Sequence, residues 1–279
     1  MRRILVTGAN KGIGRAIVEA ILREHDDAFV YLGARDAMRG DAALEAVVGS
    51  VPSAVGRVRR VPLDVTDEAS VVAAGRTVAA DGPLYGVVNN AGVYEGELAV
   101  VLDVNTQGPR RVCEVFLPLL RDDGRVVMIS SAAGPSYVAS CRPDRREAFL
   151  DPNVQWADVQ SLAAEVLSGA ADGLPANAYG LSKALLNAYT LLLARTNPDL
   201  RVNACTPGFI ETDLTRPFSV NSGKTPAEMG MKAPAAGARA PMLLLFGELE
   251  GNGRYYGSDG LRSPLDRYRS PGDPPYEGD

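Results

Sequence analysis

The sequence predicts one α/β domain built on a doubly wound parallel sheet of about seven strands, with helices on both faces. Short apolar runs rich in β-branched residues alternate with helical patterns along most of the 279-residue chain. A glycine-rich turn follows the first of these runs. With 46% hydrophobic residues, the chain can also fill a substantial core. Alternation of strands and helices is typical of a parallel sheet between two helical layers.

The predicted elements follow one another in a regular order. The predicted strands are the apolar runs at residues 4–7, 29–33, 58–63, 87–89, 126–130, 202–205 and 254–256. The predicted helices lie at about 13–24, 37–49, 67–80, 97–120, 176–196 and 235–248.

Two longer stretches interrupt this order. Residues 132–178 form an insert that contains the helix-like WADVQSLAAEVL. Residues 214–233 are polar and rich in Gly and Pro, and we interpret them as a lid. The main domain is expected to cover 1–257, followed by a Pro/Gly-rich tail over 258–279 whose end is poorly ordered.

Composition limits the partners and the location of the protein. The net charge of −5 argues against a broad nucleic-acid or membrane-surface footprint. Three scattered cysteines without a CxxC motif suit a reducing compartment. Because the first apolar run ends at Val6 and no stretch reaches the length of a membrane span, we expect a cytoplasmic protein. With His25 as the only histidine, Ser-His-Asp hydrolysis and multi-histidine metal sites are not expected.

The glycine-rich turn TGANKGIG predicts a site for a dinucleotide. Its glycines, Gly8, Gly12 and Gly14, follow a predicted strand and precede a predicted helix. Glycines allow the backbone to approach a pyrophosphate, and the N–H groups at the start of the next helix bind the anion. A tight turn without a ligand is the alternative, but the strand–turn–helix context favours a Rossmann-type nucleotide site.

The end of the second strand, LGARD, bears on which dinucleotide is bound. An acidic residue here accepts hydrogen bonds from the ribose 2′-hydroxyl of NAD. Arg35 occupies this position, and an arginine suits the 2′-phosphate of NADP. Lys11 and Arg15 add positive charge nearby. We therefore expect NADP(H), although Asp36 leaves NAD open and all three cations could be ordinary surface residues.

The apolar segment around residues 177–194 carries an unusual charge. Lys183 is the only charged residue between Pro175 and Ala194. A helix that is apolar all round is buried, and an unpaired ammonium is costly there. Tyr179 lies one turn earlier on the same face, so the lysine has a candidate partner.

Taken in order, the motifs resemble those of the short-chain dehydrogenases/reductases over residues 1 to about 257. The matching segments are TGANKGIG at 7–14, LDVTD at 63–67, NNAG at 89–92, VNTQG at 104–108, ISS at 129–131, YGLSK at 179–183 and PGFIETD at 207–213. The ANKGIG turn, the ARD after the second strand and the long insert are most similar to the carbonyl-reductase subgroup. That subgroup acts with NADPH and its members are typically monomers.

The resemblance implies a set of cofactor-binding residues. The glycine turn would line the pyrophosphate, and other segments would hold the adenine, the ribose groups and the nicotinamide amide. The implied residues are Gly8, Asn10, Lys11, Gly12, Ile13, Gly14, Arg35, Asp64, Val65, Asn89, Ala91, Gly92, Asn105, Tyr179, Lys183, Pro207, Gly208, Ile210 and Thr212.

The resemblance also implies a catalytic set of Asn105, Ser131, Tyr179 and Lys183. Hydride transfer to a carbonyl carbon leaves negative charge on the oxygen, which needs a proton and a hydrogen-bond donor. A nearby ammonium lowers the pKa of a tyrosine, so Lys183 would prepare Tyr179 as the acid. Ser131 would give the oxygen a second hydrogen bond, and Asn105 would hold a water that links Lys183 to solvent. Chance spacing for the Tyr–Lys pair, and backbone hydrogen bonding for Asn105 and Asn89, are the alternatives.

Substrate residues are expected in the segments beyond the carboxyl ends of the strands. The candidates are mostly aromatic: Tyr94, Tyr137, Trp156, Phe209 and Leu214, with Phe218 beside them in the lid. Such a pocket suits a bulky ketone or a quinone. Ordinary packing is the alternative for each aromatic residue, and Trp156 could simply anchor the insert.

The predicted function is therefore reduction of a carbonyl compound to an alcohol with NADPH. Two alternatives stay open: a non-catalytic NADP(H)-sensing or partner-binding protein, and an alcohol dehydrogenase that runs in the oxidative direction. The insert could cover the apolar helix at 176–196 within one chain, so a monomer is expected, with no nucleic-acid or membrane partner.

Overall fold

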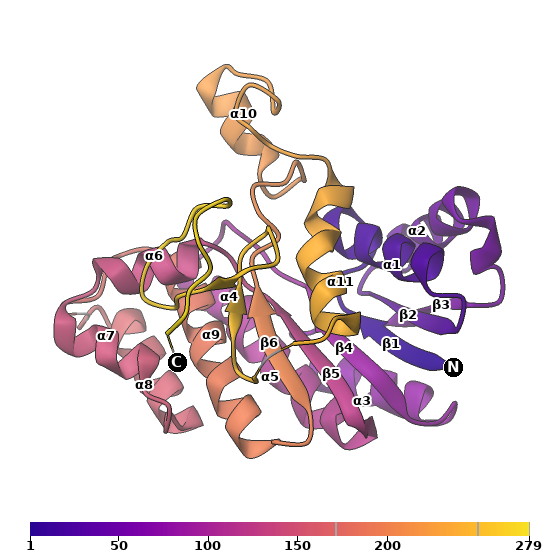
Figure 1. Ribbon diagram of the computed structural model, residues 1–279, viewed down its shortest axis with the longest axis horizontal. Helices are drawn as coiled ribbons and strands as arrows, with labels where there is room; N and C mark the ends of the chain where they lie inside the picture. The colour runs from indigo at the N-terminus through magenta and orange to yellow at the C-terminus, as the bar shows by residue number, and fades with distance from the viewer. Residues whose placement is uncertain (171, 250, 279) are drawn as a thin grey trace.

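A computed structural model describes residues 1–170, 172–249 and 251–278. One sheet forms its centre, in the order β3-β2-β1-β4-β5-β6-β7-β8 (Figure 1). The strands are β1 (Arg2–Val6), β2 (Ala28–Ala34), β3 (Val58–Pro62), β4 (Leu84–Asn89), β5 (Leu120–Ile129), β6 (Arg201–Cys205), β7 (Tyr255–Tyr256) and β8 (Arg262–Ser263). The first seven are parallel, and the predicted doubly wound α/β class is confirmed.

The eighth strand is the departure from the predicted sheet. Within the tail the chain turns back and β8 pairs antiparallel to β7, with Tyr255 opposite Ser263. Gly260 adopts φ 82°, a conformation that glycine reaches without strain, and this allows the tight return. Arg269 then pairs with Asp259, and both side chains are largely buried. The tail is thereby attached to the edge of the sheet.

Helices cover both faces of the sheet (Figure 1). They are α1 (Gly12–Glu24), α2 (Ala37–Ser50), α3 (Glu68–Ala79), α4 (Leu98–Leu102), α5 (Gly108–Phe116), α6 (Ala133–Ser140), α7 (Pro143–Leu150), α8 (Trp156–Leu167), α9 (Ala178–Thr196), α10 (Arg216–Ser222) and α11 (Arg239–Phe246). Helices α1, α2 and α11 pack on one face, and α3, α5 and α9 pack on the other.

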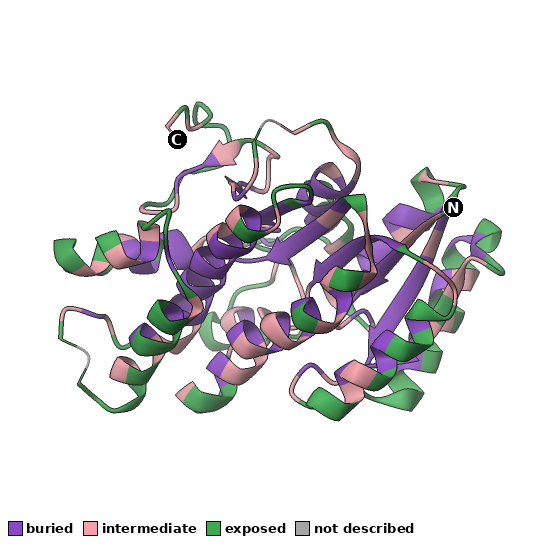
Figure 2. Cartoon of the chain, turned by 90° about the horizontal axis from the view of Figure 1, so that it is seen from below, coloured by how far each residue is buried: buried purple, intermediate pink, exposed green. Residues whose placement is uncertain are grey.

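The strands read as apolar runs because both of their faces are covered. In β1, Ile4 and Val6 belong to the core under α1, whereas Leu5 belongs to the opposite core under α3 and α5. All three side chains are fully buried. Figure 2 shows the strands of the sheet buried and the exposed residues gathered on the outer sides of the helices.

The predicted helix at 97–120 is divided in the structure. It consists of α4, a π-helical segment η2 (Asp103–Gln107), α5 and a 3₁₀ turn η3 (Leu117–Leu119). Pro109 and Pro118 each remove a backbone donor, and β5 begins directly afterwards, earlier than predicted. Single π-helical turns within helices are frequent at functional sites, and η2 carries Asn105.

The insert at 132–178 packs against α9. It contains α6, α7 and α8, whose apolar residues join those of α9 in one core. Every residue from Gly180 to Thr190 is buried. The burial inferred for this apolar helix is thus confirmed.

The polar segment at 214–233 contains α10, which projects from the body of the molecule (Figure 1). None of the described helices combines the length and the apolar character of a membrane span.

Candidate active site

A cavity of about 820 Å³ opens at the carboxyl edge of the sheet. The order of the strands reverses between β1 and β4, and ligands bind in the crevice at such a point. Segments that follow several strands converge on it. They include residues 8–15 after β1, Arg35 after β2, 63–66 after β3, 90–95 after β4, 129–131 at the end of β5 and 207–218 after β6.

The glycine turn fits closely against the loop after β4. Gly8 has φ 62°, and a Cβ there would lie 2.8 Å from the Cα of Ala91. A Cβ on Gly14 would lie 2.5 Å from the carbonyl oxygen of Gly8. Glycine is therefore required at both positions, and the turn places the start of α1 against the cavity.

Asn90 holds these two segments together. Its Nδ2 donates to the carbonyl oxygens of Thr7 at 2.9 Å and Gly8 at 3.2 Å. Its side chain lines the cavity, whereas that of Asn89 does not. Because side chains alternate along a strand, Asn89 points into the core, where its Nδ2 lies 3.4 Å from the sulfur atoms of Cys113 and Met128. Asn89, predicted to border the cofactor, thus lies outside the cavity, and its neighbour Asn90 lines it.

The second strand ends with an arginine that is free to meet a ligand. The side chain of Arg35 is 72% exposed, lines the cavity and lies 3.8 Å from the carboxylate of Asp64. Asp36 has a different task, because its carboxylate caps α2 by accepting from the backbone N–H of Arg39 at 2.8 Å. Asp36, the residue that made NAD an alternative to NADP, therefore acts as the N-cap of α2.

Most of the other predicted cofactor residues also line the cavity. They are Gly8, Asn10, Lys11, Gly12, Ile13, Gly14, Asp64, Val65, Ala91, Gly92, Pro207, Gly208, Ile210 and Thr212.

Ser131, Tyr179 and Lys183 meet at one end of the cavity. The Lys183 ammonium is buried, donates to the carbonyl oxygen of Ile129 at 2.9 Å and lies 5.6 Å from the centre of the Tyr179 ring. Burial lowers the pKa of Lys183 to about 8.

The pKa of Tyr179 lies above its ordinary value, opposite to the predicted direction. Burial raises the pKa of Tyr179, the Ser131 hydroxyl opposes that shift, and nearby Tyr94 adds to it. The ammonium contacts the Ile129 carbonyl, so desolvation dominates at the phenol.

Asn105 lies behind this group and is fully buried. Its Oδ1 accepts from the backbone N–H of Val93 at 2.9 Å, and its Nδ2 donates to the carbonyl oxygen of Val93 and the hydroxyl of Ser182. It joins the loop after β4 to α9 and does not itself line the cavity. A Cβ on Gly92 would lie 3.2 Å from its Oδ1 and 3.7 Å from the Lys183 Nζ, so Asn105 and the ammonium are neighbours.

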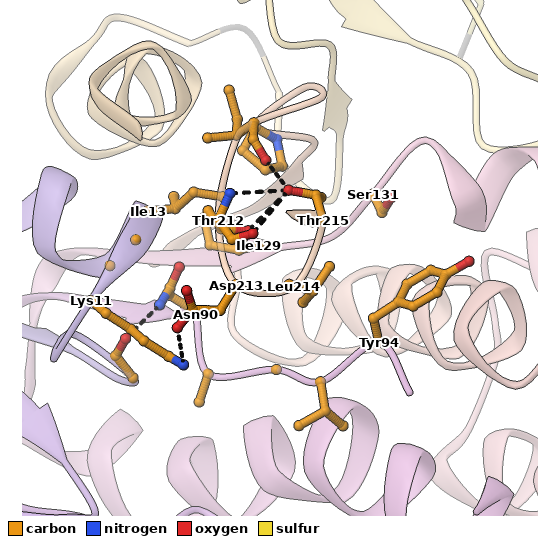
Figure 3. A pocket seen from close by; sticks show the side chains of 18 of the residues that line it. Lys11, Ile13, Asn90, Tyr94, Ile129, Ser131, Thr212, Asp213, Leu214 and Thr215 are labelled. Atoms are coloured by element: carbon orange, nitrogen blue, oxygen red, sulfur yellow. Dashed lines mark hydrogen bonds and ion pairs between the residues drawn. The ribbon is translucent and has the colours of Figure 1, made fainter. Parts of the chain in front are cut away.

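The same end of the cavity carries the aromatic candidates. Tyr94, Phe209 and Leu214 line it as predicted for a substrate pocket, together with Phe218 from α10. Figure 3 shows Tyr94 and Ser131 together, with Lys11 at the opposite end.

Tyr137 and Trp156 are elsewhere, and their predicted contact with substrate is corrected. Tyr137 is 3% exposed and packs edge-on against Phe149 inside the insert. Trp156 packs on Tyr189 of α9, with ring centres 5.3 Å apart, and lies under the Arg110 guanidinium. Both residues stabilise the insert where it covers α9.

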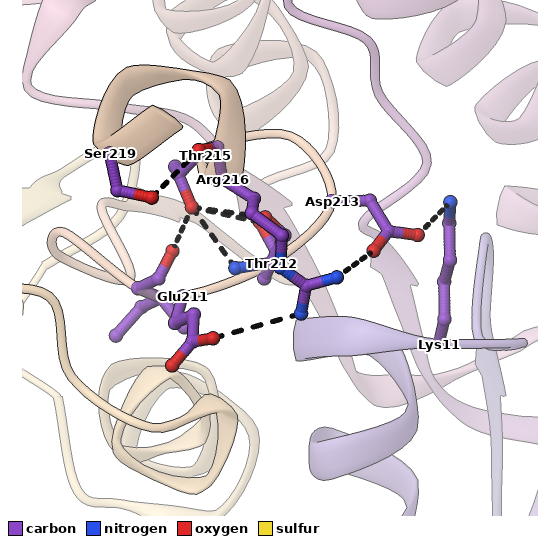
Figure 4. Close-up of polar contacts among 8 residues, drawn as sticks. Lys11, Glu211, Thr212, Asp213, Thr215, Arg216 and Ser219 are labelled. Atoms are coloured by element: carbon purple, nitrogen blue, oxygen red, sulfur yellow. Dashed lines mark hydrogen bonds and ion pairs between the residues drawn. The ribbon is translucent and has the colours of Figure 1, made fainter. Parts of the chain in front are cut away.

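The segment after β6 also carries charged residues that the sequence analysis did not single out, Glu211, Asp213 and Arg216 (Figure 4). Lys11 forms an ion pair of 2.7 Å with Asp213, and Arg216 lies 3.3 Å from Asp213 and 3.7 Å from Glu211. The Thr215 hydroxyl donates to the carbonyl oxygen of Ile210. The PGFIETD motif predicted cofactor contacts for this segment. It did not indicate that Asp213 pairs with Lys11.

The acidic residues, the cysteines and the histidine are scattered in the part of the chain that the structure describes. Within it, His, Cys, Asp and Glu side chains form no group that could hold a metal ion. Cys113, Cys141 and Cys205 are buried, and burial raises the pKa of each thiol.

Comparison with known proteins agrees with this geometry. A family model described as short chain dehydrogenase matches residues 2–142. Carbonyl reductase (NADPH) 3 of Mus musculus is 33% identical over 86% of this chain and 91% of its own length. Carbonyl reductase (NADPH) 1 of Homo sapiens is 30% identical over 86% of this chain and 89% of its own.

Among solved structures, salutaridine reductase from Papaver somniferum superposes with a TM-score of 0.78, at 26% identity, over 92% of this chain and 99% of its own. The protein is a doubly wound nucleotide-binding α/β protein with a cavity at the carboxyl edge of its sheet. The chain belongs to the short-chain dehydrogenase family.

Proposed function

We propose that the protein is an NADPH-dependent oxidoreductase that reduces a bulky ketone or a quinone to an alcohol. One observation carries the proposal: Ser131, Tyr179 and Lys183 lie in the same cavity as the glycine turn. The carbonyl reductases that resemble this chain are named for NADPH, which is consistent with this assignment.

The cavity fits a phosphorylated dinucleotide. Gly8 and Gly14 allow the turn to pack closely against the loop after β4, and the first turn of α1 opens on the cavity. Arg35 and Lys11 supply positive charge at the end where a 2′-phosphate would lie. Asp36 does not oppose a phosphate from within the cavity, because it caps α2.

The bound cofactor would supply the hydride, and the chain would supply the proton and the orientation. Tyr179 and Ser131 would bind the carbonyl oxygen as it gains charge, with Tyr179 giving the proton. The raised pKa of Tyr179 keeps the phenol protonated before the reaction. Lys183 would stabilise the phenolate that remains, since it carries a charge at neutral pH and lies beside the ring. Asn105 would keep the loop after β4 and α9 in place beside the ammonium, through its hydrogen bonds to Val93 and Ser182.

A substrate panel tests the proposal. The protein is mixed with NADPH or NADH and a series of aryl ketones, cyclic ketones and quinones, and cofactor oxidation and alcohol formation are both measured. NADPH consumption matched by alcohol formation is the expected result. Binding of NADPH without turnover of any compound would support the sensing alternative. Faster alcohol oxidation than carbonyl reduction at equal cofactor concentrations would support the oxidative alternative.

We also propose a cytoplasmic monomer with small-molecule partners only. Support comes from the insert, which covers α9 with Trp156 and its neighbours, and from three cysteines that form no disulfide among themselves. Light scattering on a sizing column tests the oligomeric state, and a mass of twice the chain would refute it. Cell fractionation tests the location.

A further inference from the structure

A chain of aromatic rings joins the proposed acid to the lid. The ring centre of Tyr94 lies 4.8 Å from that of Tyr179 and 4.9 Å from that of Phe218. Phe218 in turn lies 6.3 Å from Phe209. These separations are within the range of attractive aromatic pairs. All four residues line the cavity, so the rings form a continuous wall that begins at the phenol of Tyr179.

Tyr94 is the central member of this wall. It follows the NNAG segment after β4, contacts α9 through Tyr179 and contacts α10 through Phe218. It keeps partial exposure toward the cavity, whereas a purely structural aromatic such as Tyr137 is almost fully buried. Packing therefore leaves part of the Tyr94 ring available to a ligand.

We propose that Tyr94 is a specificity-determining residue that selects carbonyl compounds with a planar aromatic group attached to the carbonyl carbon. The inference rests on the proposed function, because it assumes that the carbonyl oxygen binds at Tyr179 and Ser131. A substituent on that carbonyl then lies beside the ring that touches Tyr179. A planar group gains offset or edge-on contact with Tyr94 and Phe218 in addition to burial, whereas a saturated ring of the same size gains burial alone.

The opposite end of the cavity is a poor binding place for an aromatic substituent. It is lined by Lys11, Glu211, Asp213 and Arg216, which form ion pairs with one another. An apolar substituent would leave these charges poorly solvated. The aromatic wall is thus the favoured place for it.

The test compares two ketones of nearly equal size, acetophenone and cyclohexyl methyl ketone. For each enzyme the ratio of their kcat/KM values is measured, so that differences in intrinsic reactivity cancel between variants. Tyr94→Leu, which keeps an apolar side chain but removes the ring, should reduce the aryl preference by about three- to tenfold. Tyr94→Phe should keep the wild-type ratio, because the ring remains. In the double variant Tyr94→Leu/Phe218→Leu, the aryl preference should fall by less than the product of the two single-variant reductions, because the two rings belong to one wall.

Val220→Ala is the matched control on α10. Its side chain is exposed and lies outside the cavity, so the ratio should not change. Circular dichroism and the Kd for NADPH show whether each variant folds and binds cofactor. An unchanged ratio in Tyr94→Leu, with both ketones still reduced, would overturn the inference and leave the proposed function intact. Failure of the wild-type protein to reduce any carbonyl compound would overturn both.

Discussion

Lys11 in the glycine turn and Asp213, which immediately precedes the lid, form an ion pair although 202 positions separate them, with Nζ and Oδ2 2.7 Å apart. The pair lowers the pKa of Asp213 and closes the charged end of the cavity. A dinucleotide phosphate that recruits Lys11 must therefore compete with this carboxylate.

Asp213→Asn should strengthen NADPH binding, because Lys11 loses its competing partner. Both side chains are more than half exposed, so the gain is limited to about fivefold in Kd. Fluorescence titration measures it, and the gain should shrink at high salt. Asp266→Asn is a suitable control, since it removes an exposed partner of Arg267 in the tail. Weaker NADPH binding by Asp213→Asn would show that the carboxylate assists the cofactor.

Arg35 and Asp36 are adjacent but should respond differently to substitution. Arg35→Ala should raise the Kd for NADPH about tenfold or more and leave that for NADH nearly unchanged, because charge-assisted hydrogen bonds to a phosphate are lost. Asp36→Ala should instead cost about 1 kcal/mol of stability through the lost helix cap. Isothermal titration with both cofactors and thermal unfolding separate the two effects. An equal loss for NADH and NADPH in Arg35→Ala would contradict the assignment.

Sequence reasoning works best for candidate residues that are close together in the chain. The glycine turn and the Tyr179–Lys183 spacing are local, and a strand or helix places their residues in a known direction. It failed for Asn89 because one position at the end of a strand decides whether a side chain enters the core or the cavity.

Contacts between segments far apart in the chain could not be predicted in this way. The partner of Lys11, the strand added by the tail and the packing of Trp156 on Tyr189 depend on segments far apart in the chain. The orientation of the Lys183 ammonium toward Ile129 also depends on where β5 ends.

Trp156 should matter for stability and not for catalysis. Trp156→Ala removes a partly buried ring from the interface between α8 and α9, and should cost about 2 kcal/mol of unfolding free energy. The kcat/KM should stay near the wild-type value, because the residue lies outside the cavity. Chemical denaturation and steady-state assays measure the two quantities. A large loss of activity in a stable, folded variant would restore Trp156 to the substrate site.

Lys183 should impose a pH limit on activity and a cost on stability. Its pKa is lowered to about 8, so kcat/KM should fall as pH rises above about 8 and the ammonium is lost. The ordinary pKa is 10.5, so below pH 8 both folded and unfolded chains hold the proton, and burial of the charge destabilises the fold. That penalty is relieved as pH rises from 8 toward 10.5, because the unfolded chain alone then stays protonated.

Lys183→Met tests the same group. The variant should lose most activity. Removal of the buried charge stabilises the fold, and loss of the hydrogen bond to Ile129 partly offsets that gain. The net result should be an unfolding free energy about 1–2 kcal/mol higher at pH 7. The gain should diminish between pH 8 and 10.5. Denaturant titrations at several pH values measure it, and a gain that grows with pH would contradict the lowered pKa.

The central claim is that the Tyr179 phenol protonates the carbonyl oxygen beside a bound nicotinamide. Tyr179→Phe removes that hydroxyl and keeps the ring that packs on Tyr94. The most direct measurement is kcat for an active ketone together with the Kd for NADPH in this variant. We predict a loss in kcat of at least about a hundredfold with NADPH affinity nearly unchanged. Wild-type turnover by Tyr179→Phe would contradict the account.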